Sequence, residues 1–312
     1  MASYYARFAR NGLGLIVTEA TFIDSESSKA YYGQPGMHCI AHERSWARVV
    51  EAVHRERGRI VLQLQHGGPL AEPGLNSPVG ATDRPAGGVS WQRKLPYGPV
   101  RPLHSDELPR IRSSFANAAA RAMAAGFDGV EIHGARGYLL DAFLSATNTR
   151  EDRYGHGLAG RLLFPIEVVA AVREAIGDAP LIYNLSLYKM DDSTYLPPGG
   201  ADEVATIVQA LGHAGVDAIH ATTRDMFAPA LDGEPFVKLV KRSASCLVIG
   251  NGGLGGIEGA ERVLGEGHCD LVSMARTLVA NPDLIRRHRE KMPLRAFVRG
   301  MERELVQNEQ AE

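Results

Sequence analysis

The chain has 312 residues, of which 45% are hydrophobic and 22% charged, and its formal net charge is −2. This composition is typical of a soluble globular protein, and the near-neutral charge argues against nucleic acid or an anionic membrane as a partner. No apolar run reaches the roughly 18 residues that would span a bilayer. The scattered cysteines (Cys39, Cys246 and Cys269) and the lack of an apolar signal core favour a cytoplasmic location.

In chain order, the predicted elements alternate between helices and strands. A helix over 4–10 precedes a strand over 13–18, and a helix over 43–57 precedes a strand over 59–64. Segment 71–104 is rich in Pro and Gly without a clear period, so we expect a functional loop such as a lid. The remaining helices, 106–125, 158–175, 201–214, 233–243 and 256–265, precede strands 129–133, 181–185, 218–221, 247–250 and 271–274.

Seven strands separated by helices indicate βαβ units and a parallel sheet. A closed (β/α)8 TIM barrel needs eight strands, and this chain opens at a helix with no strand before it. An open doubly wound sheet is the alternative, but no early strand carries the G-x-G-x-x-G turn of a dinucleotide fold. We therefore predict an α/β protein with one domain over 1–312, an N-terminally truncated TIM barrel. Its first strand would lie upstream, come from another chain or be lost.

Candidate phosphate donors follow the last two predicted strands. Gly252 and Gly253 form a tight turn with bare backbone N–H groups, and Ala275-Arg276 adds a guanidinium. Donors from the loops after the last two strands form the usual phosphate site of TIM barrels, whose active sites lie at these strand ends. An ordinary glycine turn beside a surface arginine is the alternative.

A candidate catalytic loop follows the strand that ends at His133. Gly134-Ala135-Arg136-Gly137-Tyr138 would aim Arg136 and Tyr138 to one side. A histidine where a buried strand opens into a loop favours catalysis over packing. His66 is expected to cap a helix or loop or to serve the site, and His220 to be structural or substrate-lining in preference to catalytic. No His, Cys, Asp or Glu cluster has metal-ligand spacing, so we predict no metal.

These motifs, in this order, resemble the Old Yellow Enzyme family of FMN-dependent ene-reductases and NADH:flavin oxidoreductases. The resemblance covers nearly the whole chain. It rests on Val17-Thr18-Glu19-Ala20-Thr21, Gln63-Leu64-Gln65-His66-Gly67-Gly68, Glu131-Ile132-His133-Gly134-Ala135 with Gly137-Tyr138-Leu139-Leu140, and Asn251-Gly252-Gly253 with Arg276.

The resemblance also implies roles for single residues. Ala20 would lie against the flavin ring, and Gln63 would hydrogen-bond its pyrimidine edge. His133 would donate to the carbonyl or nitro oxygen of the substrate, and Tyr138 would protonate the substrate carbon. The FMN phosphate would be held by Gly252, Gly253, Ala275 and Arg276.

The chain departs from the family pattern at the redox end of the site. Arg136 stands where the second oxyanion donor is normally His or Asn, and a guanidinium suits a carboxylate or a phosphate. Asn184 stands where an arginine normally lies near flavin N1. Pro69 also replaces a usual arginine, and Ala275 replaces a usual glycine.

We predict an FMN-dependent oxidoreductase that transfers a hydride from NAD(P)H, through the flavin, to an activated alkene of the α,β-unsaturated carbonyl type. The alternative, raised by Arg136 and Asn184, is a repurposed flavin-free or non-redox barrel: a lyase, an isomerase or a pseudoenzyme. A third hypothesis is a fragment of a conventional family member. The expected partner is a small-molecule substrate, without nucleic acid or membrane, and a homodimer is compatible with the family.

Overall fold

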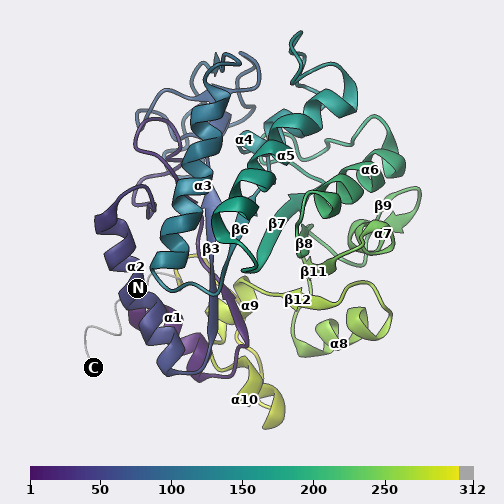
Figure 1. The fold of residues 1–312 in the computed structure, drawn as a ribbon. Coiled ribbons are helices and arrows are strands. Elements are labelled where there is room, and N and C mark those ends of the chain that lie inside the picture. Colours follow the sequence, from purple (N-terminus) through teal and green to yellow (C-terminus); the bar gives the residue numbers. More distant parts are fainter. Residues whose placement is uncertain (302–312) are drawn as a thin grey trace.

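The computed structural model of the protein describes residues 1–301, and its centre is one curled parallel sheet (Figure 1). The main strands follow the order β1-β3-β6-β7-β8-β11-β12, and every neighbouring pair is parallel. The strands are β1 (Leu15–Val17), β3 (Arg59–Gln65), β6 (Gly129–His133), β7 (Leu181–Ser186), β8 (Ala218–Thr222), β11 (Leu247–Asn251) and β12 (Leu271–Ser273).

Helices cover the outer face of this sheet (Figure 1). They are α1 (Ala2–Arg10), α2 (Ile40–Arg55), α3 (Leu108–Ala124), α4 (Leu139–Leu144), α5 (Gly157–Ile176), α6 (Gly200–His213), α7 (Phe236–Ser243), α8 (Ile257–Gly265), α9 (Arg276–Ala280) and α10 (Leu284–Arg289). The spacing of apolar residues explains their docking. In α2, Trp46, Val49, Val50 and Val53 lie at helical spacing and are all buried, so one stripe of the helix faces the sheet.

The central strands are buried on both faces. All residues of β6 and of β7 are buried. Helices cover the outward-facing side chains of these strands, and the inward-facing side chains pack inside the barrel. Inside the barrel, Val61, Ile182, Ala218 and Ile249 form a small apolar cluster that Val17 joins. This cluster forms the floor beneath the strand ends, which is where the candidate site lies.

The predicted strand over 13–18 is shorter in the structure, where it is β1, and a separate short strand, β2 (Thr21–Phe22), follows it. Both pair with β3, and residues 18–20 form a break between them. The Thr18 hydroxyl accepts a hydrogen bond from the Gln63 backbone N–H at 3.0 Å and thereby bridges the break. The break carries Ala20 out of the sheet at the end of β1.

Short elements that the sequence pattern did not indicate appear in two loops. The segment over 71–104 contains β4 (Val79–Gly80) and β5 (Arg101–Pro102), which pair in parallel. A small antiparallel hairpin of β9 (Pro229–Leu231) and β10 (Glu234–Pro235) precedes α7, so α7 starts three residues later than predicted.

The barrel is open between β1 and β12. Within residues 1–301 each of these strands pairs with a single neighbour, whereas a closed barrel of eight strands would pair them through one more strand. The predicted fold, a TIM barrel with seven identifiable strands, is confirmed. The single-domain organisation stays a prediction. In the described part of the chain, no helix has the length and apolar character needed to cross a bilayer.

Candidate active site

His133 ends β6 and lies at the centre of the site. The side chain is 7% exposed and points to the inner face of the barrel, two residues after the equally inward Glu131. The next residue must be glycine, because a Cβ at Gly134 would lie 2.1 Å from the ring of the fully buried Tyr183. The close approach of these two strands therefore fixes where His133 leaves the sheet.

The His133 imidazole is neutral. Burial, together with the nearby Arg136 charge, lowers the pKa of His133 to about 4. The Ala135 backbone N–H donates to Nδ1 of His133 at 3.4 Å, which favours the tautomer with the proton on Nε2. His133 can therefore donate a hydrogen bond from Nε2 without carrying a charge.

Tyr138 lies against His133 in an edge-to-face contact, with ring centroids 4.9 Å apart. Burial raises the pKa of the Tyr138 phenol, so the phenol stays protonated at neutral pH. The Gln65 side chain hydrogen-bonds Tyr138, and it also accepts a bond from the Gln34 amide at 2.7 Å. The site thus presents an imidazole N–H donor beside a protonated phenol.

The same network reaches the predicted flavin contact. The Ala20 carbonyl accepts hydrogen bonds from the Gln34 amide and from the Tyr31 hydroxyl, both at 3.1 Å. Gln34 therefore links Ala20 to the Gln65–Tyr138 pair. Sequence reasoning missed Tyr31 and Gln34, because both belong to a loop without a periodic pattern.

Arg136 adopts a left-handed backbone conformation with φ +62°, which is uncommon for a residue other than glycine. Two bonds to the loop after β7 hold it: its N–H donates to the Ser186 hydroxyl at 2.8 Å, and its carbonyl accepts from Met190 N–H at 3.0 Å. A third contact follows at Gly137, whose N–H donates to Asp141. The catalytic loop is therefore fixed at both ends.

Asp141 forms a buried ion pair with Lys189. The Lys189 Nζ lies 2.8 Å from the Asp141 carboxylate, and their side chains are 5% and 4% exposed. Burial raises the pKa of Asp141 despite the lysine beside it. Because Asp141 also accepts from Gly137, the pair joins the loop after β6 to the loop after β7.

A chain of buried polar side chains crosses the barrel interior at the level of the strand ends. Glu131 is fully buried, and its two carboxylate oxygens bond Gln63 Nε2 at 2.5 Å and His220 Nδ1 at 2.7 Å. His220 Nε2 then meets the Ser273 hydroxyl at 2.7 Å, and Ser273 accepts from the Asn251 amide at 2.9 Å. We refer to these five residues as the interior polar chain.

The interior polar chain bears on the role of His220. Both ring nitrogens have protein partners, which favours a structural role over a catalytic one, and that role stays a prediction. It also shows that the Gln63 amide bonds Glu131, which orients the predicted flavin contact. The sequence did not single out Glu131 or Ser273, because their meaning depends on contacts between strands.

The predicted phosphate turn has the required backbone geometry. Gly252 and Gly253 follow β11 with φ +139° and +63°, and a Cβ at Gly252 would lie 2.4 Å from the Thr223 carbonyl oxygen. Ala275 and Arg276 follow the neighbouring strand β12, and both are exposed. Within residues 1–301, the Arg276 guanidinium makes no ion pair. Backbone N–H groups and a guanidinium are the donors that suit a phosphate, so phosphate binding here stays a prediction.

Asn184 lies in β7, two residues before its end and in register with His133, and it is 3% exposed. It carries no charge that could replace the usual arginine. His133, Arg136, Tyr138, Ala20, Gln63 and Asn184 therefore gather at the ends of β1, β3, β6 and β7, and Gly252, Gly253, Ala275 and Arg276 at the ends of β11 and β12.

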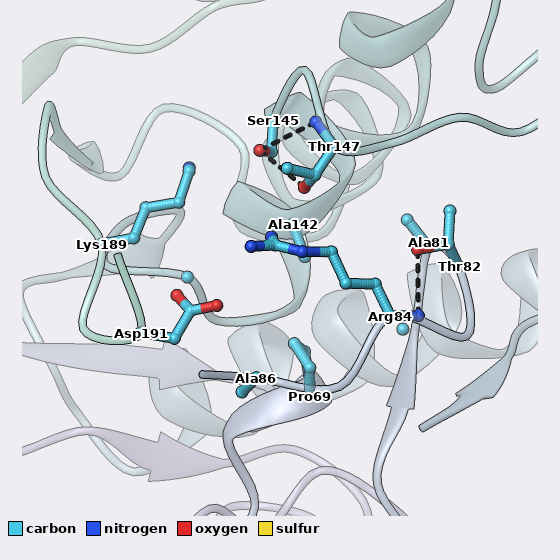
Figure 2. Close-up of a pocket in the computed structure, with 12 residues that line it drawn as sticks. Pro69, Ala81, Thr82, Arg84, Ala86, Ala142, Ser145, Thr147, Lys189 and Asp191 are labelled. Carbon is cyan, nitrogen blue, oxygen red and sulfur yellow. Dashed lines mark hydrogen bonds between the residues drawn. The ribbon is translucent and has the colours of Figure 1, made fainter. Parts of the chain in front are cut away.

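A small cavity lies behind the catalytic loop. Gly137 and Ala142 line it together with Arg84, Lys189 and Asp191, and in Figure 2 the Arg84 side chain reaches into it toward Asp191. Its volume is about 30 Å³, which is room for one or two water molecules and not for a substrate. A more open hollow of about 380 Å³ lies between residues 81–83, 102–105 and 149–152 and contains no predicted site residue.

His66 contacts two loops. Its Nδ1 accepts from Gly68 N–H at 3.1 Å, its Nε2 lies 3.2 Å from the Ser27 hydroxyl, and burial lowers its pKa to about 4. These contacts agree with the capping role.

Three potential metal ligands come together at the start of α2. Atoms of His38, Cys39 and His42 lie within 4.8 Å of one another, which the sequence analysis did not anticipate. Burial lowers the pKa of both histidines; the Asp24 charge opposes this at His38, and the His38 and Lys29 charges add to it at His42. The absence of a bound metal stays our prediction.

The fold defines a class, an open TIM-type barrel whose predicted site residues lie at the ends of its strands. Residues 1–295 match the sequence pattern of the NADH:flavin oxidoreductase / NADH oxidase family, and the chain belongs to this family. It is therefore an FMN-dependent oxidoreductase that uses NAD(P)H, and the expected recognition, enzyme class and cofactors are confirmed.

Individual relatives agree with this assignment. The chain is 34% identical to putative 12-oxophytodienoate reductase 2 of Oryza sativa subsp. japonica, over 96% of this chain and 80% of that protein. It is 32% identical to 12-oxophytodienoate reductase 2 of Arabidopsis thaliana, over 95% of this chain and 81% of that protein. The solved old yellow enzyme homologue from Zymomonas mobilis superposes with a TM-score of 0.87 at 30% identity, over 96% and 85%. Morphinone reductase in complex with tetrahydroNAD superposes with a TM-score of 0.84 at 30% identity, over 97% of this chain and 85% of that one.

Proposed function

We propose that this oxidoreductase reduces an activated alkene, adding a hydride and a proton across a C=C bond conjugated to a carbonyl group while NAD(P)H is oxidised. The observation that carries the proposal is the pairing of a neutral His133, with its proton on Nε2, and a protonated Tyr138 in ring contact. A conjugated oxygen gathers negative charge as its alkene accepts a hydride, and a fixed donor stabilises that charge.

The residues present fit FMN at two ends. Gly252 and Gly253, with the guanidinium of Arg276, would hold the phosphate. Gln63, oriented by Glu131, would face the polar edge of the ring, and the break at residues 18–20 would bring Ala20 against the ring. When bound, FMN supplies two-electron chemistry that links the nicotinamide to the alkene.

The protein's own residues perform three tasks in this proposal. His133 Nε2 and the Arg136 guanidinium donate to the substrate oxygen, and a permanent charge at Arg136 strengthens that donation. Tyr138 holds a proton on its phenol oxygen for the substrate carbon, and Gln65 orients that phenol. The buried Asp141–Lys189 pair keeps both donors in place by fixing their shared loop.

Two measurements on the purified chain test the proposal. FMN titration followed by fluorescence quenching is expected to saturate at one FMN per chain, and the FMN-loaded protein is expected to consume NADPH with 2-cyclohexen-1-one under anaerobic conditions. FMN binding without enone-dependent NADPH consumption would reject alkene reduction. Failure to bind FMN would favour the alternative of a flavin-free barrel.

Two further expectations belong to the proposal. We propose a cytoplasmic location, which cell fractionation tests, and a homodimer, which sedimentation velocity tests. The role of each site residue is likewise part of the proposal, and single substitutions test these roles in turn.

A further inference from the structure

Two arginines share one tyrosine ring beside the catalytic loop. The Arg136 Cζ lies 5.3 Å from the centroid of the Tyr188 ring, and the Arg224 Cζ lies 4.9 Å from the same centroid. Both distances fall within the range of a cation–π contact. The three residues come from the loops after β6, β7 and β8, which are neighbouring strands. We call Arg136, Tyr188 and Arg224 the arginine pair site.

The arginine pair site borders the donors of the proposed reaction. The Arg136 charge is close enough to lower the pKa of His133, and it also opposes the rise in the pKa of Tyr138. Arg224 follows Thr223, whose N–H donates to the Asn251 carbonyl at 2.9 Å, and Met226 N–H donates to the Gly252 carbonyl at 3.2 Å. The loop of Arg224 is therefore tied to β11, and the site spans from the catalytic loop toward the phosphate turn.

Within residues 1–301, no ion pair involves Arg136 or Arg224. Of the nearby acids, Asp141 binds Lys189 and Asp225 accepts from Phe227 N–H at 2.8 Å, whereas the Asp191 Oδ1 beside Gly137 has no hydrogen-bond partner in the described part of the chain. Two like charges held against one ring repel each other, and a bound anion would relieve that repulsion.

We propose that the arginine pair site binds a carboxylate of the substrate, so the preferred substrates are α,β-unsaturated compounds that carry a carboxylate. The proposal rests on the function proposed above and adds the substrate class. A guanidinium binds a carboxylate through two parallel hydrogen bonds, which gives both affinity and orientation. A substrate carboxylate is favoured over a coenzyme phosphate because the site adjoins His133 and Tyr138, where the substrate reacts.

Equilibrium binding tests the proposal without requiring turnover. Isothermal titration of the FMN-loaded protein compares trans-cinnamate with cinnamamide, which has the same shape but no charge. We expect cinnamate to bind at least tenfold more tightly at low salt, and we expect added salt to reduce this preference. Equal or weaker binding of cinnamate would overturn the proposal.

Variants then locate the preference. Arg136→Met with Arg224→Met is expected to remove the preference for cinnamate, and Arg224→Met alone is expected to change cinnamamide binding less than twofold. Arg224 is an exposed loop residue, so the single change Arg224→Met tests the proposal even if the double variant folds poorly. It is expected to reduce the preference for cinnamate over cinnamamide about threefold. The matched control is Arg59→Met, at the start of β3 and so at the opposite end of the barrel, which is expected to keep the full preference.

Two outcomes separate carboxylate binding from a role in coenzyme binding and from a failure of the proposed reaction. If the double variant weakens NADPH binding but keeps the preference for cinnamate, the arginines serve the coenzyme phosphate and the proposal is wrong. If cinnamate binds preferentially and the variants abolish that preference, the site stands even when 2-cyclohexen-1-one is not reduced. In that case only the proposed reaction fails.

Discussion

Replacing Glu131 by alanine is expected to destabilise the protein strongly, because Glu131 is the centre of the interior polar chain. The side chain is fully buried, and its carboxylate accepts from Gln63 and pairs with His220. Removing it leaves the buried His220 and the half-buried Gln63 without this acceptor. Breaking a buried pair from one side destabilises by roughly 3–5 kcal/mol. With an unfolding entropy of about 2.1 cal/mol/K per residue, this corresponds to a fall in Tm of about 5–8 °C.

The assay is thermal unfolding at pH 7 followed by circular dichroism, with two companion variants. Glu131→Gln keeps one acceptor, so its Tm is expected to fall about half as much as that of Glu131→Ala. Glu266→Ala, which removes a carboxylate from an exposed pair with Arg262, is expected to leave Tm unchanged. Wild-type Tm in Glu131→Ala, or an equal loss in Glu266→Ala, would refute the reasoning.

The same variant tests how the contribution of Glu131 to stability changes with pH. Burial raises the pKa of Glu131, but His220 and the hydrogen bonds outweigh it, so the net pKa is lowered. A carboxyl group with a lowered folded pKa stabilises above its unfolded pKa and loses that contribution as the pH falls. The difference in stability between wild type and Glu131→Ala is therefore expected to be full at pH 7 and smaller near pH 4.

Three further predictions concern the site. Gly252→Ala would place a Cβ 2.4 Å from the Thr223 carbonyl oxygen at φ +139°, so we expect at least a tenfold higher Kd for FMN, measured by fluorescence titration; an unchanged Kd would contradict the phosphate turn. Tyr138→Phe is expected to lower turnover of an enone by about 10²–10⁴ while NADPH binding is unchanged, in stopped-flow and steady-state measurements, and full turnover would exclude the phenol as the acid. His133 and His66 have pKa values lowered to about 4, so each favours folding above its unfolded pKa of about 6.5 and loses this contribution as the pH falls toward 4. In urea unfolding, the free energy of unfolding is expected to fall between pH 6.5 and 4, and to fall less in His66→Gln. An equal dependence of this free energy on pH in the two proteins would contradict the prediction.

Much of the fold could be predicted because the strands carry their own pattern. The runs at 129–133 and 181–185 are apolar, short and bounded by loops, and the structure extends the second by only one residue. The break at residues 18–20 could not be predicted, because it arises from the Thr18 bond to Gln63 across two strands. The pairing of β4 with β5 likewise depends on contacts between residues 22 positions apart.

The site divides in the same way. His133 and the glycines after β11 stood out because residue type and strand position agree on one meaning. Tyr31, Gln34 and Ser273 did not, because each acts through a partner distant in the chain. The contact of Arg136 and Arg224 with one ring was beyond the sequence for the same reason, although the unusual arginine at position 136 was itself visible.

The opening of the sheet has a consequence for handling the protein at high concentration. Leu15 of β1 and Leu271 of β12 are 42% and 46% exposed, and each lies on a border strand of only three residues. Short border strands limit intermolecular β pairing, because they offer few main-chain groups to an incoming chain. Substitutions that extend either strand would therefore raise the tendency to self-associate, and a charged residue at position 15 or 271 would lower it.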